Sequence, residues 1–298
     1  MSETTNPAAT LRTFTISTPV RACRLRRDDL RQLYRIIQER QTDHRQMVLG
    51  QLAQLPTESA EQFETRRSRV ANAFVTTVNI TLASGEIITD SSEHFVNSEN
   101  LPDNIVTVFF TTIAGPGAIG LAEQQQPHRA TLLLDFSRPT VFDFSKFPTF
   151  ATENASLLHI WSSSEQWFAT LDKRISDLFM DRRTGFDWLH RPGIYDLLLL
   201  VVGLPFSFAI NYLASPFITK LNFSSNILTS AIYIYMFIAG LYIFRALFTY
   251  SRWVFPKIEI ESQYSPPMRH RGVWAAIALG IPGAVFGGAI IEAIKALW

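Results

Sequence analysis

The sequence has little of what stabilises small secreted proteins or marks an exported one. It contains a single cysteine, Cys23, among 298 residues, so no disulfide can form within the chain and a reducing compartment is indicated. The first 30 residues are polar and rich in arginine, without the apolar stretch of a signal peptide. We therefore expect the N-terminal part to remain in the cytosol.

Recognisable catalytic motifs are also missing. There is no Walker-type phosphate-binding loop, no G-x-S-x-G, and no cysteine–histidine pair in an activating setting. The six histidines lack the spacing of metal ligands; they are His44, His94, His128, His159, His190 and His270. The sequence thus predicts a protein that is not an enzyme, with no catalytic residue, no metal and no cofactor.

One glycine motif invites a nucleotide-binding interpretation. Gly115, Gly117 and Gly120 match G-x-G-x-x-G after an expected strand. The helix that should follow has room only over 118–126 before Pro127, which is too short for the usual crossover between parallel strands. A loop between antiparallel strands explains these glycines better.

Large net charge is lacking as well. The chain carries 27 Lys+Arg and 26 Asp+Glu, which excludes a strongly basic nucleic-acid binder. The charges are unevenly spread, since residues 1–192 hold 20 basic and 22 acidic residues while residues 193–298 hold only 7 and 4. This change in charge density near Arg191 indicates a soluble part followed by a membrane part.

The sparsely charged part contains three long apolar stretches. We predict membrane-spanning helices at about 193–214, 228–249 and 273–296, because about 20 apolar residues cross the hydrocarbon core. Glycines and Pro282 in the third stretch also permit a re-entrant segment. Basic residues gather before the first helix and after the second. The positive-inside rule then predicts a bacterial inner-membrane protein with a cytoplasmic N-terminal domain and a periplasmic C-terminus.

Some residues of these helices are candidates for a pore or for helix packing. The polar ones, Asp196, Asn211 and Arg245, fit the lining of a pore or polar cavity, since such groups normally face a bundle interior. An Asp196–Arg245 ion pair, or snorkelling to the interface, is the open alternative. Small residues spaced four apart predict close helix packing; they are Gly283, Ala284, Gly287 and Gly288.

The soluble part predicts an α+β domain over 11–180, in the order β-α-β-β-β-β-α. The expected strands are 11–17, a hairpin within 73–89, 104–113, 130–136 and 139–144. Helices are expected over 28–40 and, opening at Ser162–Ser164, up to about 180. A disordered N-terminus (1–10), a basic connector (181–192) and an all-α membrane domain of about three helices (193–298) complete the expected organisation.

Arginine bias is the most suggestive feature of the soluble part. Of the 27 basic residues 22 are Arg, and six crowd one segment: Arg21, Arg24, Arg26, Arg27, Arg31 and Arg35. Guanidinium groups bind phosphates through two hydrogen bonds, so this segment is a candidate nucleotide or oligonucleotide site. The alternative is a solvated helix face neutralised by Asp28, Asp29 and Glu39.

The layout resembles a group of bacterial membrane proteins. Its marks are SSSEQWFATLDKRISDLF (162–179), two apolar helices, FPKIEIES (255–262), MRHRGVW (268–274) and a last apolar stretch. In architecture it is similar to the membrane effectors of Hailong-type anti-phage defence. That resemblance implies a tetrameric, channel-like effector. A partner nucleotidyltransferase would make DNA oligomers that bind the soluble domain and control it.

From these observations we expect an oligomeric membrane effector that acts as a ligand-controlled ion channel or pore. Its cytosolic domain would sense a nucleotide or single-stranded DNA oligomer, and its partners would be the lipid bilayer and further copies of the chain, with a tetramer favoured. The alternative is a membrane-anchored scaffold or sensor that recruits a cytosolic partner without conduction. A transporter is less consistent with so few helices and no internal repeat.

Overall fold

The computed structural model describes residues 13–90, 101–119, 126–141, 148–221, 225–261 and 270–276. The chain divides into two compact units, neither of which is continuous in sequence. Unit 1 comprises Met1–Ser137, Asn154–Thr184 and Ile258–Gln263, and unit 2 comprises Arg138–Glu153, Gly185–Lys257 and Tyr264–Trp298. The sequence analysis did not anticipate that a short segment following the second apolar helix returns to unit 1.

Unit 1 is built on a six-stranded antiparallel sheet. In spatial order its strands are β1 (Phe14–Pro19), β7 (Leu157–Ser162), β6 (His128–Asp135), β5 (Ile105–Thr111), β3 (Thr77–Leu82) and β4 (Ile87–Asp90). A separate two-stranded parallel sheet pairs β2 (Cys23–Leu25) with β8 (Ile258–Ile260). The described helices of this unit are α1 (Arg27–Gln51), α2 (Ala60–Ala73), α4 (Ala114–Ala118) and α5 (Glu165–Asp181).

Local sequence signals explain where these helices begin. The hydroxyl of Ser164 accepts a hydrogen bond from the Trp167 N–H at the start of α5, and the hydroxyl of Ser59 accepts one from the Gln62 N–H at the start of α2. The Asp29 carboxylate accepts from the Arg26 N–H before α1. Each bond satisfies an amide that has no partner within the helix, which stabilises the helix end by about 1 kcal/mol.

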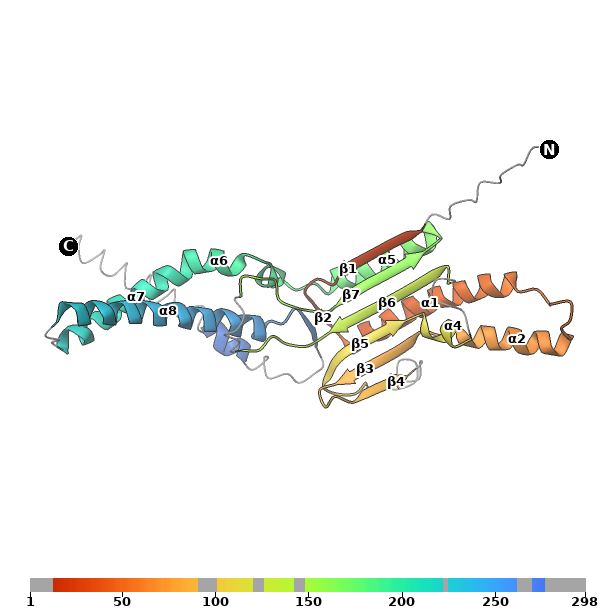
Figure 1. Ribbon diagram of the computed structural model, residues 1–298, viewed down its shortest axis with the longest axis horizontal. Coiled ribbons are helices and arrows are strands. Elements are labelled where there is room, and N and C mark those ends of the chain that lie inside the picture. The colour runs from red at the N-terminus through yellow and green to blue at the C-terminus, as the bar shows by residue number, and fades with distance from the viewer. Residues whose placement is uncertain are drawn as a thin grey trace, which may run out of the picture. The chain divides into compact units, whose positions relative to one another are not determined.

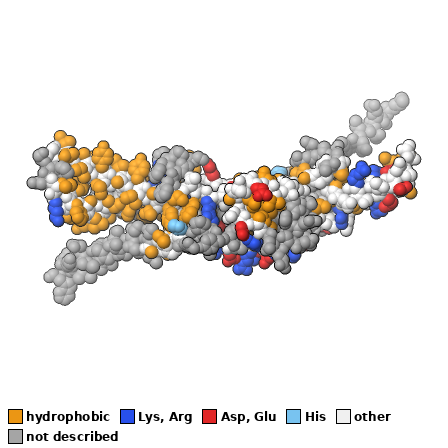
Figure 2. Space-filling view, turned by 90° about the horizontal axis from the view of Figure 1, so that it is seen from below, with side chains coloured by type: hydrophobic (Ala, Val, Ile, Leu, Met, Phe, Trp, Pro, Cys, Tyr) orange, Lys and Arg blue, Asp and Glu red, His pale blue; other side chains and the backbone are white. Residues whose placement is uncertain are grey.

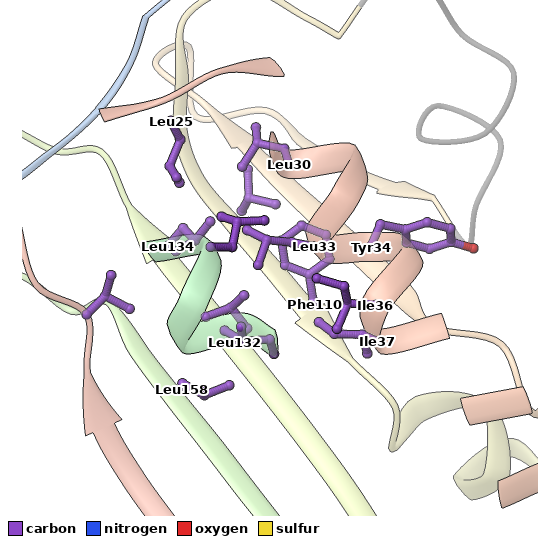
Figure 3. Close-up of a cluster of buried hydrophobic side chains, with 14 of the residues drawn as sticks. Leu25, Leu30, Leu33, Tyr34, Ile36, Ile37, Phe110, Leu132, Leu134 and Leu158 are labelled. Carbon is purple, nitrogen blue, oxygen red and sulfur yellow. The ribbon is translucent and has the colours of Figure 1, made fainter. Parts of the chain in front are cut away.

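The core of unit 1 lies between one face of the large sheet and helices α1 and α5 (Figures 1 and 3). Strand β6 alternates buried and half-buried residues from His128 to Leu134, as expected for a sheet with one face packed against helices. Leu132 and Leu134 of β6 and Phe110 of β5 are fully buried, as are Leu33 and Ile37 of α1. At about 25 cal/mol per Å² of apolar surface, this burial is the main stabilising term of the unit.

Unit 2 contains two long apolar helices. The first is assembled from α6 (Ile194–Leu198), the π-helical turn η3 (Leu199–Gly203) and α7 (Leu204–Lys220), and the second is α8 (Asn226–Val254). Both are long and apolar enough to cross a membrane, and only 11% of the most apolar window of each is buried within the protein. A helix of a soluble core would be mostly buried, whereas these show apolar side chains over their surface (Figure 2). The short helix η2 (Asp187–His190) precedes them.

The π-turn has an identifiable cause. Pro205 is the second residue of α7, two residues after the π-turn. Proline has no N–H, and its ring clashes with the carbonyl four residues earlier. The backbone relieves this clash by adopting the wider π-helical turn η3 (Leu199–Gly203).

The structure agrees with the sequence analysis on the α+β class of the soluble part and on two helices that could span a membrane. The third predicted span, 273–296, lies outside the described residues beyond residue 276, and residues 270–276 are helical. No strand is formed over 138–140, and most of the rest of the predicted strand 139–144 lies outside the described residues. Strand β7, which the sequence analysis missed, provides the neighbour of β6.

Candidate functional site

Strand β2 lies between two segments that connect unit 1 to the apolar helices. On one side, Thr184 donates its N–H to the Ala22 carbonyl (3.0 Å) and Arg24 donates to the Arg182 carbonyl (2.9 Å). On the other side β8 pairs with β2 in parallel, and the Glu261 N–H donates to the Leu25 carbonyl (2.7 Å). We call β2, residues 182–184 and residues 258–261 the junction.

The junction matters because of what is attached to it. Thr184 is the last residue of its segment in unit 1, and unit 2 resumes at Gly185 with the chain that leads into the first apolar helix. Helix α8 ends at Val254, and β8 begins at Ile258. The chain segments that precede and follow the two apolar helices therefore both pair with the same three-residue strand.

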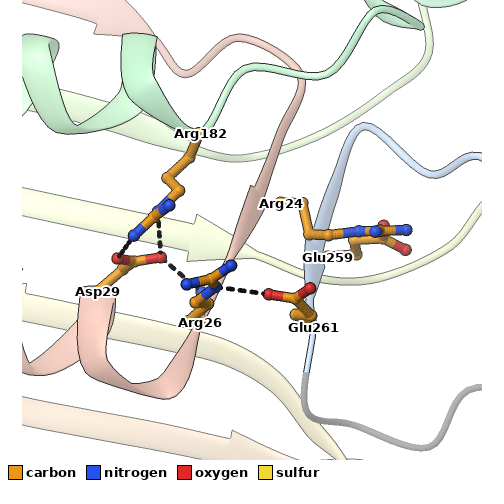
Figure 4. Close-up of polar contacts among 6 residues, drawn as sticks. All are labelled: Arg24, Arg26, Asp29, Arg182, Glu259 and Glu261. Atoms are coloured by element: carbon orange, nitrogen blue, oxygen red, sulfur yellow. Dashed lines mark hydrogen bonds and ion pairs between the residues drawn. The ribbon is translucent and has the colours of Figure 1, made fainter.

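Ion pairs reinforce the junction (Figure 4). Arg24 of β2 forms an ion pair with Glu259 of β8, and Arg26 binds Glu261 with 2.8 Å between Nε and Oε2. Because β2 and β8 are parallel and in register, Arg24 lies directly opposite Glu259. Cross-strand pairs of opposite charge at this spacing stabilise sheet pairing by a few tenths of a kcal/mol to about 1 kcal/mol.

Asp29 is the most buried acidic group at this end of unit 1. It is 2% exposed and binds Arg182 through two hydrogen bonds of 2.8 and 2.9 Å. This pairing holds the pKa of Arg182 above its usual value, first through the hydrogen bonds and then through the charge of Asp29. The sequence analysis treated Asp29 only as a neutralising neighbour, since its partner lies 153 residues away.

The structure places the six predicted arginines in different environments. Arg24, Arg26, Arg27 and Arg31 each form an ion pair, the last two with Asp103 and Asp28. Arg21 and Arg35 are exposed. Carboxylates thus already engage four of the six guanidinium groups, and phosphate binding by this segment stays a prediction.

A second buried polar cluster joins His44 of α1 to His128 at the start of β6. His44 and His128 are each 1% exposed, with ring centroids 4.9 Å apart, and His128 stacks on Trp167 at 5.0 Å. The Ser162 hydroxyl, which itself bonds to the Ser164 carbonyl, lies 2.8 Å from His128 Nδ1.

Burial keeps both histidines neutral. It lowers the pKa of His44 to about 4, with a further contribution from His128, and it also lowers the pKa of His128. Within the described residues, no group of three or more His, Cys, Asp or Glu side chains could hold a metal ion. The pair is therefore a neutral part of the core.

The glycine motif sits in the connection between β5 and β6, which are antiparallel neighbours. This arrangement is wrong for a dinucleotide fold, which needs parallel strands. Gly115 has a packing reason instead: a Cβ there would lie 2.0 Å from the Ala73 carbonyl oxygen at the end of α2. Gly120 lies outside the described residues.

The predicted intramembrane polar residues have distinct surroundings. Asp196 is exposed at the start of the first apolar helix and accepts a hydrogen bond from the Thr149 hydroxyl (3.0 Å). Asn211 is half-buried further along the same helix, and Arg245 is 8% exposed on α8. Their predicted role in a pore stays a prediction.

Close helix packing occurs at positions that the sequence analysis did not select. A Cβ on Gly240 of α8 would lie 2.9 Å from the Ser207 Cα of α7, and one on Gly203 would lie 2.8 Å from the Phe244 ring. Small residues here let the two helices approach closely. The predicted packing residues Gly283, Ala284, Gly287 and Gly288 lie outside the described residues.

Comparison with known proteins adds no relative. The sequence matches no protein-family model, and no curated protein or solved structure is significantly similar to it.

Proposed function

We propose that this protein is an oligomeric membrane effector, a ligand-controlled channel or pore whose α+β unit senses an anionic ligand such as a nucleotide or single-stranded DNA oligomer. The observation that carries the proposal is the junction, where β2 binds both the segment entering the apolar helices and the segment leaving them. A ligand that shifts β2 relative to the sheet would pull on both ends of the helices together. Such an element can bias two states of a helix bundle.

Oligomerisation follows from the size of the helical part. Two or three helices per chain are too few to enclose a water-filled path, so several copies must contribute, and a tetramer is the favoured assembly. The apolar side chains on α7 and α8 would then face lipid on one side and neighbouring copies on the other. In this proposal the membrane is the bacterial inner membrane, the α+β unit is cytoplasmic and the C-terminus is periplasmic.

Ion flux from liposomes tests the proposal. The full chain is reconstituted in dye-loaded vesicles, and flux is recorded before and after adding short single-stranded DNA oligomers or mononucleotides. We expect a ligand-dependent change in flux, together with a tetrameric mass in detergent. A monomeric protein that conducts no ions under any of these conditions would contradict the channel proposal.

A matched pair of variants tests the junction itself. The pairs Arg24–Glu259 and Arg66–Glu58 have nearly equal side-chain exposures, 35% and 10% against 33% and 10%, but only the first lies in the junction. Each pair is broken by Arg→Gln, and Arg66→Gln also removes a hydrogen bond from Arg66 to the Ala53 carbonyl. Arg24→Gln should alter ligand-dependent flux several-fold and Arg66→Gln should not; equal effects would remove the junction from the mechanism.

A membrane-anchored scaffold that recruits a cytosolic partner is the second candidate. The carboxylate pairing of Arg24, Arg26, Arg27 and Arg31 favours it, because these groups are already occupied. The scaffold predicts that apolar replacement of Asp196, Asn211 and Arg245 leaves function intact, whereas a channel lined by them would lose conductance.

A further inference from the structure

Arg252 carries a full charge in an almost closed environment near the end of α8. It is 6% exposed, and its Nε donates to the Leu189 carbonyl at 3.0 Å. The guanidinium carbon lies 4.7 Å from the centre of the Phe248 ring. Among the described residues, the Nη2 atom has no hydrogen-bond partner. Across the residues that the structure describes, Arg252 forms no ion pair with a carboxylate.

Burying a guanidinium without an anion is costly. Removing a charge from water costs several kcal/mol even after relaxation, and a carbonyl or an aromatic face compensates only part of that cost. The negative end of the α8 dipole, which Arg252 lies close to, contributes up to about 1 kcal/mol more. The compensation visible in the protein is therefore incomplete, and an anion would complete it.

Other positive groups of unit 2 share the surroundings of Arg252. Burial first, and then the charges of Arg252 and Lys257, lower the pKa of His190 to about 4. Asp187 acts in the opposite direction, but it is paired with Arg191. The Phe255 backbone also raises the pKa of His190, and within the described residues His190 Nε2 has no hydrogen-bond partner. The local potential is positive.

Aromatic side chains accompany these cations near the end of the helix. Trp253 stacks on Tyr250, and the Trp274 indole N–H donates to the Ser251 hydroxyl. Arg271 lies over the Phe255 ring, 5.5 Å from its centre. Tryptophan, tyrosine and basic residues together are typical of the zone where lipid head groups meet a spanning helix, and basic pockets there bind anionic head groups.

We propose that Arg252 and Lys257, next to His190, form a binding site for a phosphate group, supplied either by an anionic phospholipid or by free phosphate. The phosphate provides the counter-ion that Arg252 lacks, through charge-assisted hydrogen bonds. This inference relies on membrane insertion of α8 and does not require channel activity, so lipid binding and ion flux can succeed or fail separately.

The test measures binding to the full-length protein in two arms. In the lipid arm, nanodiscs of phosphatidylcholine alone are compared with nanodiscs containing phosphatidylglycerol, and the lipids retained after transfer to detergent are counted by native mass spectrometry. In the phosphate arm, the thermal midpoint in lipid-free detergent is compared in phosphate and in chloride at equal ionic strength. Retained phosphatidylglycerol identifies the lipid source, and a shift with inorganic phosphate alone identifies the soluble one.

Matched variants separate the site from general charge effects. Arg252→Gln should weaken retention or the phosphate effect about tenfold, and Arg252→Lys should weaken it less, because a charge-assisted bond is lost in one and replaced in the other. Arg191→Gln removes an exposed arginine of the same unit, already paired with Asp187, and should leave binding unchanged.

A variant that fails to fold does not end the test, since Lys257→Gln changes a half-buried side chain outside the helix and should weaken binding about threefold. Equal retention of both lipids with no phosphate-specific shift in the wild type overturns the proposal. Lipid retention or a phosphate effect in Arg252→Gln or Lys257→Gln that equals the wild type also overturns the proposal.

Discussion

Unit 1 buries large apolar side chains, whereas the helices of unit 2 expose them. In unit 1 Phe110, Leu132 and Ile160 are fully buried, while in unit 2 Phe208, Leu213 and Phe217 are each more than 60% exposed. Apolar composition alone is therefore a poor guide to a core. The exposed apolar surface of the two unit 2 helices is suited to hydrocarbon, whereas the apolar side chains of unit 1 form a closed core.

Buried charge separates the two units in the same way. Asp29 in unit 1 is satisfied by two hydrogen bonds from Arg182, so the pair needs nothing further. Arg252 in unit 2 has a carbonyl and an aromatic ring as its recorded partners. A protein in water can supply counter-ions from its own chain, whereas a helix end near a bilayer can take them from lipid.

The largest expected effect is from truncating the core of unit 1. Phe110→Ala should destabilise unit 1 by about 4 kcal/mol, because it removes a fully buried ring and leaves a cavity. Phe217→Ala, at a side chain that is 70% exposed, should cost about 0.5 kcal/mol or less in a detergent micelle. Hydrogen exchange of β6 amides in the full-length protein measures the first; similar losses in both variants would break the comparison.

The pH dependence of unit 1 should be nearly as large. The pKa of His44 is about 4 in the folded state and about 6.5 when unfolded, so the unfolded chain binds its proton first as the pH falls. Stability is complete above about pH 6.5 and is lost progressively down to about pH 4, by about 3 kcal/mol. Exchange of β6 amides at pH 7 and pH 4.5 detects this loss. His44→Phe should remove most of this pH-dependent loss of stability. An unchanged pH profile in that variant would contradict the assignment of the loss to His44.

Helix packing in unit 2 should be sensitive at Gly240. Gly240→Ala places a methyl group 2.9 Å from the Ser207 backbone, and forcing the helices apart should cost about 2 kcal/mol. Gly272→Ala is the control, because a Cβ there meets no atom of the described residues within 4 Å, and this change should be neutral or slightly stabilising. Resistance to unfolding by dodecyl sulfate compares the two; a tolerated Gly240→Ala would mean that the helices separate freely.

The smallest contrast lies in the helix caps. Ser164→Ala removes the bond from the Trp167 N–H and should destabilise α5 by about 1 kcal/mol. Ser225 occupies the same position before α8 but makes no capping hydrogen bond, so Ser225→Ala should have almost no effect. Exchange rates in the first turn of each helix provide the measurement, and equal changes would contradict the cap assignment.

Features with a local signal could be predicted. The serines before α5, the apolar period of α1 and the two apolar helices are all properties of contiguous residues, and the structure contains each element. Strand β7 was missed because its six residues follow a polar stretch and are bounded by no strong turn signal. Residues 139–141 of the predicted strand 139–144 form no strand, because β-branched and aromatic residues favour a strand only where a neighbour pairs with them.

The arginine segment shows why site prediction is harder. Arginines in a row are visible in any sequence, but their partners Glu259 and Glu261 are each 235 residues away. No pattern within the segment distinguishes a guanidinium that binds phosphate from one that is paired to a distant carboxylate. Arg252 was used only to orient the helices, because basic residues after an apolar helix are usually interface anchors.

The sequence by itself determined that this chain joins a charged α+β part to long apolar helices, because apolar period, charge density and helix caps are encoded within a few turns. Only the tertiary structure decided that β2 binds the segments on both sides of those helices, and that Arg252 is buried with no carboxylate partner among the described residues. Both depend on atoms far apart in the chain. Strand pairing and charge burial are set by which surfaces meet after folding.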